Sequence, residues 1–97
     1  MSEQVVVRST RTSTSATTLV TGATYLKAFV CLGTATAGII KFYDGTSASG
    51  TLILEVDVPG NNNNIQEVAI PTPGLLCNTG LHVTFPTGYN VTVFYGL

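Results

Sequence analysis

Apolar and polar residues alternate along most of this chain with a period of two, which is the period of a β-strand. The segment Thr51–Pro59, "TLILEVDVP", shows the pattern most clearly, because an apolar residue stands at every second position with Ile53, Glu55 and Asp57 between them. Pro59 ends this half-buried strand, since proline cannot donate a ladder hydrogen bond. Helix-forming residues nowhere recur with the 3.6-residue period of an amphipathic helix.

Strand patterns of this kind recur from one end of the chain to the other. They predict strands at Gln4–Thr10, Thr24–Gly33, Gly38–Gly45, Thr51–Pro59, Ile65–Pro71, Leu81–Phe85 and Tyr89–Leu97, and a shorter apolar segment within Thr72–Gly80. Turn signals separate them at intervals of about 8 to 12 residues, which is typical of sandwiches and jelly rolls. The sequence therefore predicts an all-β fold: a single antiparallel β-sandwich or jelly-roll domain of about eight short strands with an extended N-terminal arm.

Two strands have informative faces. In Thr24–Gly33, one face carries Leu26, Ala28, Val30 and Leu32, and the other face is also largely apolar. Such a strand is expected to be central in its sheet, or covered on its second face by a partner. In Tyr89–Leu97 three alternate positions form one face, namely Val91, Val93 and Tyr95.

The N-terminal residues have a different composition from the rest. The segment Arg11–Thr18, "RTSTSATT", is rich in Ser and Thr and is expected to be a connector that is mobile or laid on a neighbour. We therefore predict an N-terminal arm and connector over residues 1–18 and a β-sandwich over residues 19–97. A chain of 97 residues is too short for a second domain with a useful core.

Charged residues make up only 9% of the chain, against about 25% in an average soluble protein. A free monomer usually keeps a charged surface and guards its sheet edges with charge. We infer that copies of the same chain or a larger assembly cover much of the surface; an uncharged polar surface of Thr, Ser, Asn and Gly is the alternative. The net charge of −1 argues against a nucleic acid partner.

The charges are also unevenly distributed. All four basic residues lie within the first 41 positions, and four of the five acidic residues follow them. Such an asymmetry could serve patch-to-patch docking between subunits. The N-terminus has no apolar signal-peptide core and no run reaches the length of a membrane helix, so we expect synthesis in a cytoplasm and no membrane partner. Cys31 and Cys77 lie in apolar strands and are expected to be buried free thiols, although one disulfide is possible.

The stretch "DGTSASG" raises the question of a phosphate-binding loop. Gly45 and Gly50 have the P-loop spacing, but Thr51 stands where the lysine is required, and a strand pattern follows instead of a helix. A hairpin turn opened by Asp44-Gly45 is the better interpretation.

Other potentially reactive residues do not form a catalytic pattern. His82 lacks a partner at a metal-binding or catalytic spacing and is expected to point away from Leu81 and Val83, toward solvent or a subunit contact. Glu55 and Asp57 share one strand face about 7 Å apart, which suits a glycosidase pair, but tryptophan to wall a sugar cleft is absent. The sequence therefore predicts a non-enzymatic protein with no cofactor and no metal.

The second half of the chain resembles small structural proteins of tailed bacteriophages. The resemblance is carried by "GIIKFYDGTSASGTLILEV", "AIPTPGLLCNTGLHVTF" and "NVTVFYGL", over residues 38–97. In that group a "YDG-T-S-x-x-G" hairpin precedes a "GL-x-V" strand and a terminal "VTV-x-Y" strand. The resemblance implies a virion protein, such as a capsid decoration (cement) protein that sits as an oligomer, often a trimer, on the capsid surface. It transfers no functional residues.

A cement role gives the N-terminal arm a purpose. An extended arm can add a strand to a neighbour's exposed edge, here on the major capsid protein. We predict Val5, Val6, Val7, Arg8 and Arg11 as partner-binding residues. Deletion of residues 1–12 is expected to abolish capsid binding and to leave the fold intact.

Two interpretations of a different class stay open. One is a receptor-binding or carbohydrate-binding module at a phage tail or fibre, which exposed aromatic residues near Tyr89 and the Asn61–Asn64 loop would favour. The other is a small hydrolase that depends on Glu55 or Asp57.

Overall fold

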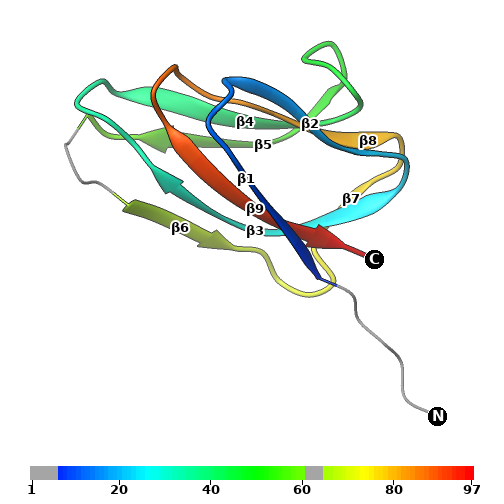
Figure 1. Ribbon diagram of the computed structural model, residues 1–97. Helices are drawn as coiled ribbons and strands as arrows, with labels where there is room; N and C mark the ends of the chain where they lie inside the picture. The colour runs from blue at the N-terminus through cyan, green and yellow to red at the C-terminus, as the bar shows by residue number, and fades with distance from the viewer. Residues whose placement is uncertain (1–6, 61–64) are drawn as a thin grey trace.

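The computed structural model describes residues 7–60 and 65–97, and these form two antiparallel sheets packed face to face (Figure 1). All nine strands in this part of the chain belong to one sheet or the other, and it contains no helix. The predicted all-β sandwich is confirmed. No helix in the described residues is long and apolar enough to cross a bilayer.

The first sheet, called sheet A, has β1, β9, β3 and β6 in that order, with β7 also paired to β3. These strands are β1 (Arg8–Thr12), β9 (Asn90–Gly96), β3 (Thr24–Leu32), β6 (Ile65–Ala69) and β7 (Leu75–Cys77). The second sheet, sheet B, has the order β2-β8-β4-β5. Its strands are β2 (Ala16–Thr21), β8 (Gly80–Thr84), β4 (Gly38–Asp44) and β5 (Thr51–Val58).

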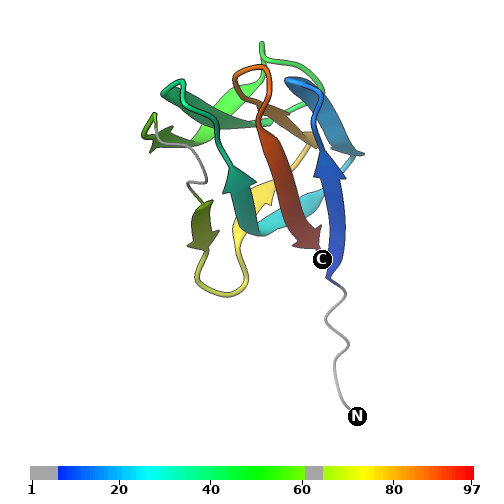
Figure 2. The same ribbon diagram turned by 60° about the vertical axis from the view of Figure 1, so that its left-hand side comes forward.

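The strand orders are those of a jelly roll. Strands β6 and β7 pair with successive parts of the same side of β3, so they act as one strand interrupted by the segment "IPTPG", residues 70–74. Counted that way, two four-stranded sheets face each other, and consecutive strands cross from one sheet to the other everywhere except at the β4–β5 hairpin. Figure 2 shows these crossings at both ends of the sandwich. Such a double Greek-key arrangement defines the jelly roll.

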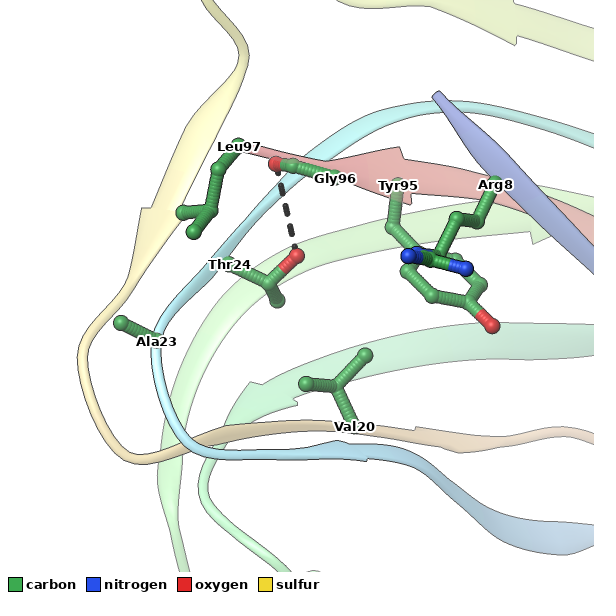
Figure 3. A pocket seen from close by; sticks show the side chains of 7 residues that line it. All are labelled: Arg8, Val20, Ala23, Thr24, Tyr95, Gly96 and Leu97. Atoms are coloured by element: carbon green, nitrogen blue, oxygen red, sulfur yellow. Dashed lines mark hydrogen bonds between the residues drawn. The ribbon is translucent and has the colours of Figure 1, made fainter. Parts of the chain in front are cut away.

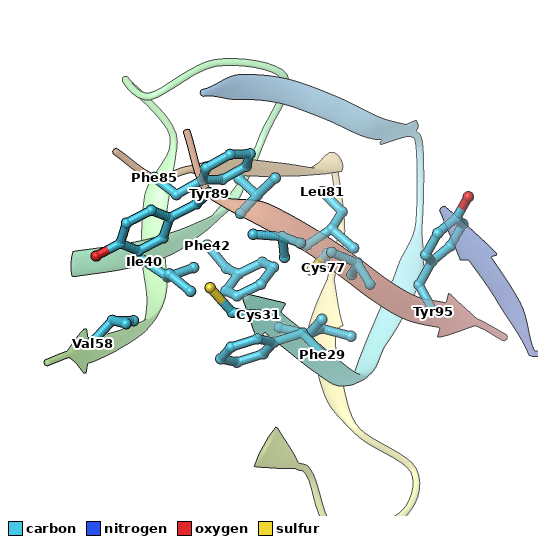
Figure 4. Close-up of a cluster of buried hydrophobic side chains, with 14 residues drawn as sticks. Phe29, Cys31, Ile40, Phe42, Val58, Cys77, Leu81, Phe85, Tyr89 and Tyr95 are labelled. Atoms are coloured by element: carbon cyan, nitrogen blue, oxygen red, sulfur yellow. The ribbon is translucent and has the colours of Figure 1, made fainter. Parts of the chain in front are cut away.

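The core lies between the two sheets and comes from alternate residues of both (Figure 4). The rings of Phe29 on β3 and Phe42 on β4 meet across the sheets with their centroids 5.0 Å apart. The Tyr89 hydroxyl donates a hydrogen bond to the Thr36 carbonyl oxygen, 2.7 Å away, so this large ring is buried with its polar atom satisfied. The fully buried set also includes Leu26, Cys31, Ile40, Cys77, Leu81, Val83, Val91 and Val93.

Strand β3 is central in sheet A, as its two apolar faces predicted. However, the positions whose side chains face the core change from even to odd numbers along β3. Leu26 is buried, yet Phe29 and Cys31 are buried too, because the register against β9 shifts by one residue between Leu26 and Ala28. A β-bulge of this kind turns the following side chains to the other face. The expectation that Leu26 shares a face with Ala28 and Leu32 was therefore wrong.

The expectation that Arg11–Thr18 is a connector that is mobile or laid on a neighbour was also wrong, because both ends of this segment belong to strands. Arg8–Thr12 pairs with β9, and Ala16–Thr21 pairs with β8, so the proposed boundary between residues 18 and 19 falls inside a strand. Hydroxyl groups hold the bend between the two sheets: the Oγ1 atoms of Thr12 and Thr17 are 2.9 Å apart, and Thr17 Oγ1 donates to the Thr14 carbonyl at 2.9 Å. The Ser/Thr-rich composition therefore marks a sheet-to-sheet bend rather than a connector.

Candidate docking site

The structure separates the partner-binding residues predicted from the sequence. Val5 and Val6 lie outside the described residues. Val7 is 54% exposed just before β1. Arg8 and Arg11 are three positions apart on one strand, so their side chains leave opposite faces of sheet A.

Arg8 belongs to the inward side of β1, where it borders a pocket. The pocket has a volume of about 280 Å³, and Figure 3 shows the side chains that line it. Arg8 and Tyr95 are register partners, and their side chains lie side by side in Figure 3. The wall comes from both sheets and from the last residues of the chain: Arg8, Val20, Ala23, Thr24, Tyr95, Gly96 and Leu97.

The polar atoms in this wall are largely occupied. The Tyr95 hydroxyl is 2.7 Å from Thr10 Oγ1, and Thr24 Oγ1 donates to the Gly96 carbonyl at 3.4 Å. Arg8 has the one charged side chain among the seven that line the pocket. An apolar hollow with a cationic rim suits an apolar side chain that is followed or preceded by an acidic group. It offers no nucleophile paired with a base, which acyl-transfer chemistry would need.

Strand β1 adds a second feature beside the pocket. It is the edge strand of sheet A, and its second side pairs with no other strand in residues 7–60 and 65–97. Edge strands present unpaired N–H and C=O groups that can accept an additional strand from another chain. Because Arg8 belongs both to β1 and to the pocket wall, one extended segment could use both features.

His82 lies away from Leu81 and Val83, as expected. Of its two expected surroundings, solvent was wrong, and a subunit contact stays a prediction. The His82 side chain is only 7% exposed on the outer side of sheet B, where it lies between its register partners Thr18 and Tyr43. Thr18 Oγ1 donates to the Thr46 carbonyl and lies 2.9 Å from His82 Nδ1, so Nδ1 carries the proton that the hydroxyl accepts. Burial lowers the pKa of His82, which keeps the ring neutral near pH 7.

Asp44 holds two turns together and is not free for catalysis. Its carboxylate accepts backbone N–H groups from Asn78, Thr79 and Gly80 at 3.0, 2.8 and 3.4 Å. These hydrogen bonds, led by the one from Thr79, lower the pKa of Asp44. Gly80 is required at this junction, because a Cβ there would come within 2.7 Å of the Gly45 carbonyl oxygen.

The "DGTSASG" stretch is a hairpin turn, as predicted. It joins β4 to β5, which pair antiparallel, and Gly50 N–H donates to the Ser47 carbonyl at 3.1 Å. The phosphate-loop interpretation is excluded by the strand that follows.

The remaining candidates do not converge on a site. Glu55 and Asp57 are both exposed on the edge strand β5, and Glu67 lies on sheet A. Cys31 and Cys77 are buried free thiols, as predicted, and burial raises the pKa of each to about 11. Among the described residues, no group of three or more His, Cys, Asp or Glu side chains is placed to hold a metal ion.

Comparison with known proteins gave no match: no family model, no curated protein and no solved structure is similar to this chain. The resemblance to phage structural proteins therefore rests on the quoted motifs alone.

Sequence reasoning found Arg8 but missed the rest of its pocket. Val20 and Leu97 are 77 positions apart in the chain and line the same pocket only because β2 and β9 lie in the two facing sheets. Leu97 is 66% exposed. An apolar residue directly after the last strand is the one local signal that the sequence offered.

Proposed function

We propose that this protein is a non-enzymatic virion structural subunit, a capsid decoration (cement) protein that binds the major capsid protein lattice and stabilises the phage head. The observation that carries the proposal is the pocket of Arg8, Val20 and Leu97 beside the free edge of β1. Jelly rolls are frequent in viral shells, which agrees with the proposal but does not carry it, since one fold serves many functions.

The docking mode follows from the chemistry of this pocket. An extended segment of a shell subunit pairs with the free edge of β1 through main-chain hydrogen bonds. One apolar side chain of that segment enters the pocket between Val20 and Tyr95. An acidic group of the same segment meets the Arg8 guanidinium, which can bind a carboxylate with two parallel hydrogen bonds.

The sparse charge of the chain fits a protein that works inside an assembly. Self-association of the subunit is part of the proposal, and the trimer implied by the resemblance stays a prediction. In this proposal the protein is synthesised in the host cytoplasm and ends on the capsid surface.

The carbohydrate-binding alternative is not favoured by the aromatic residues. Tyr89, whose exposure would have favoured it, is fully buried. All eight aromatic side chains lie in the described residues, and each is buried or half-buried. A sugar-binding platform usually presents such a ring to solvent.

Co-sedimentation with expanded empty capsids of the virus that encodes the chain tests the proposal. The wild-type protein is expected to saturate the capsids at a fixed copy number, and Arg8→Glu is expected to weaken binding at least tenfold. Lys41→Glu, on the outer side of sheet B, is the matched charge reversal and is expected to bind normally. Absence of binding by the wild-type protein, or equal binding by both variants, would contradict the proposal.

Two N-terminal deletions distinguish the contribution of β1 to capsid binding from that of the residues before it. Residues 8–12 form β1, so deleting residues 1–12 removes an edge strand and uncovers β9. This deletion is therefore expected to destabilise the fold rather than leave it intact. Deletion of residues 1–7 leaves β1 in place and is expected to reduce capsid binding without lowering the melting temperature. A normal copy number on capsids after this deletion would show that residues 1–7 do not contribute to docking. Capsid binding would then depend on the pocket and β1.

A further inference from the structure

The outer face of sheet A carries two opposite charges at its two edges with uncharged residues between them. The register places residues of four strands in rows across the sheet. One row is Arg11–Thr92–Val30–Glu67, from β1 through β9 and β3 to β6. Arg11 and Glu67 are exposed at the two ends of this row. Three strand spacings separate them, which is about 14 Å.

The neighbouring rows carry no charge. On one side lies the row Ser9–Phe94–Ala28–Ala69, and on the other side the row Asn90–Leu32–Ile65. Leu32 and Ile65 are 40% and 60% exposed although they are large aliphatic side chains. Figures 1 and 2 show sheet A as one outer layer of the sandwich, so sheet B lies on the other side of these rows.

One further charge lies near these rows, at the bulge of β3. Lys27 Nζ lies 5.7 Å from the centroid of the Tyr25 ring and donates to the Pro73 carbonyl at 3.4 Å. These contacts hold the ammonium group toward the β7 end of β3, beyond the row that contains Ala28. Lys27 therefore places no charge among the uncharged residues between Arg11 and Glu67.

We propose that two copies of this chain pack through the outer face of sheet A about a two-fold axis parallel to its strands. Such an axis, placed between β9 and β3, reverses the order of strands across the face. It lays β1 of one copy over β6 of the second copy. Arg11 then meets Glu67 of the second copy, and because the contact is isologous, the same pair forms twice.

The sizes of the apolar side chains match under the same operation. Phe94 on β9 lies over Ala28 of the second copy, so a large ring faces a small side chain in both directions. Val30 lies over Thr92 of the second copy in the central row. Aligned sheets pack about 10 Å apart, a gap that Arg and Glu side chains can span at its edges.

A different axis is disfavoured by charge. A two-fold axis perpendicular to the strands and centred on the Arg11–Glu67 row would place Arg11 over Arg11 and Glu67 over Glu67. Like charges brought together at an interface suppress that arrangement. The charge pattern therefore selects the orientation as well as the face.

This inference deepens the self-association that forms part of the proposed function, but it does not need the virion role. Arg11 and Arg8 lie on opposite faces of β1, so the two-fold contact leaves the pocket beside Arg8 open. A contact of this kind predicts a dimer, or an even-numbered assembly, of the free protein. This two-fold contact joins copies in pairs, so it cannot by itself form a trimer.

Sedimentation equilibrium of the full chain over a concentration series tests the contact with four variants. Arg11→Glu and Glu67→Arg are each expected to weaken dimerisation at least tenfold, because each brings two like-charged pairs together. The double variant Arg11→Glu/Glu67→Arg is expected to return within about threefold of the wild-type constant, because the swap restores both pairs. Lys41→Glu on sheet B is the control and is expected to dimerise normally.

Several results would overturn the two-fold contact. The first is a wild-type protein that is monomeric at all concentrations. The second is a dimerisation constant that none of the three sheet A variants changes. The third is a double variant that dimerises no more tightly than the single variant with the weaker dimerisation. A trimer indifferent to the charge swap would overturn this contact and leave the capsid proposal standing. Leu32→Ser, which keeps all charges, is a second variant for the case in which a charge reversal lowers the melting temperature, and it too is expected to weaken dimerisation.

Discussion

The two outer faces of this sandwich handle their few charges in opposite ways. On sheet B, Lys41 and Glu55 are register partners on adjacent strands, so opposite charges stand next to each other within one copy. On sheet A, Arg11 and Glu67 end the same row three strands apart, too far to compensate each other within one copy. The few charges therefore have different surroundings on the two faces. On sheet B the cation Lys41 stands beside a carboxylate of its own copy. On sheet A, in the proposed contact, Arg11 finds its carboxylate on a second copy.

The apolar residues follow the same division. Sheet B covers its central outer position with His82, which is hydrogen-bonded to Thr18 and faces the Tyr43 ring with centroids 6.2 Å apart. Sheet A leaves Leu32 and Ile65 exposed as register partners on neighbouring strands. A continuous exposed apolar area on a soluble domain usually marks an interaction site.

Sheet B also has exposed aliphatic side chains, but they do not adjoin one another. Ile39 and Leu52 lie at opposite ends of the β4–β5 pair, where their register partners are Asp57 and Tyr43. Single exposed apolar residues are normal on a protein surface. Contiguity, rather than the number of such residues, distinguishes sheet A.

The largest expected effect on stability is at the end of sheet B. Asp44→Ala removes the acceptor of three backbone N–H groups, and we expect it to lower the free energy of unfolding by about 2 kcal/mol. Urea denaturation measures this change. Asp57→Ala, at an exposed position on the same sheet, is the control and is expected to change it by less than about 0.5 kcal/mol. Equal effects of the two variants would mean that the Asp44 contacts contribute nothing specific.

Asp44 also gives an acid dependence with a definite sign. Because its pKa is lower in the folded state than its ordinary 3.8, its contribution is complete above that value and is lost as the pH falls through the lowered pKa. The difference between wild type and Asp44→Ala in urea denaturation is therefore expected to shrink below about pH 4. A difference that stays constant down to about pH 2 would contradict this assignment.

Exposed leucines on the two faces give the next comparison. Leu32→Ser on sheet A is expected to weaken self-association about tenfold, since it removes apolar area from the proposed contact. Leu52→Ser on sheet B, where the side chain is 46% exposed, is expected to leave association unchanged. Both are expected to change the stability of the monomer only slightly. Equal loss of association in both variants, measured by sedimentation, would remove the distinction between the faces.

Charge reversal compares the faces in the dilute monomer. Lys41→Glu places a carboxylate opposite Glu55, and we expect a loss of about 0.5 kcal/mol in unfolding free energy. Arg11→Glu faces Thr92 and is expected to have no effect on the monomer. Thermal denaturation at low protein concentration and low salt measures both. A larger loss of unfolding free energy from Arg11→Glu than from Lys41→Glu would contradict the view that charges are paired within one copy on sheet B and not on sheet A.

His82 gives the smallest expected effect. Burial lowers its pKa below 6.5, so the unfolded chain binds a proton more readily than the folded one does. Above about pH 6.5 the ring is neutral in both the folded and the unfolded chain, and His82 does not change the free energy of unfolding. Below about pH 6.5 the unfolded chain takes up the proton first, so the free energy of unfolding falls. The decline in melting temperature between about pH 7.5 and about pH 5.5 is expected to be smaller in His82→Gln than in the wild type. The same decline in both would show that other groups cause it.

Local patterns predicted most of the fold. The strand predicted at Thr51–Pro59 is β5, although a register shift against β4 leaves Leu52 exposed instead of on the buried face with Val58. The alternation in Tyr89–Leu97 matches β9, with Val91 and Val93 buried. The central position of β3 followed from its two apolar faces. These predictions succeeded because inward and outward residues differ in polarity at a period that the backbone itself imposes.

The failures share one cause, which is that the deciding contacts are distant in the sequence. The bulge after Leu26 is seen only in the register against β9. The composition of Arg11–Thr18 gave no warning of β2, because the ladder partners of that strand lie on β8; Thr18, for example, pairs with His82, 64 positions away. The pocket beside Arg8 and the Arg11–Glu67 row likewise depend on strand order, which no local pattern encodes.

A dilution series followed by backbone amide NMR tests the central claim most directly, since it reports which face changes when the protein associates. The account predicts concentration-dependent shifts at Val30, Leu32, Thr92 and Phe94, and constant positions for the outer residues of sheet B around Tyr43 and His82. Shifts centred on Tyr43 and His82, or spectra that do not change with concentration, would contradict it.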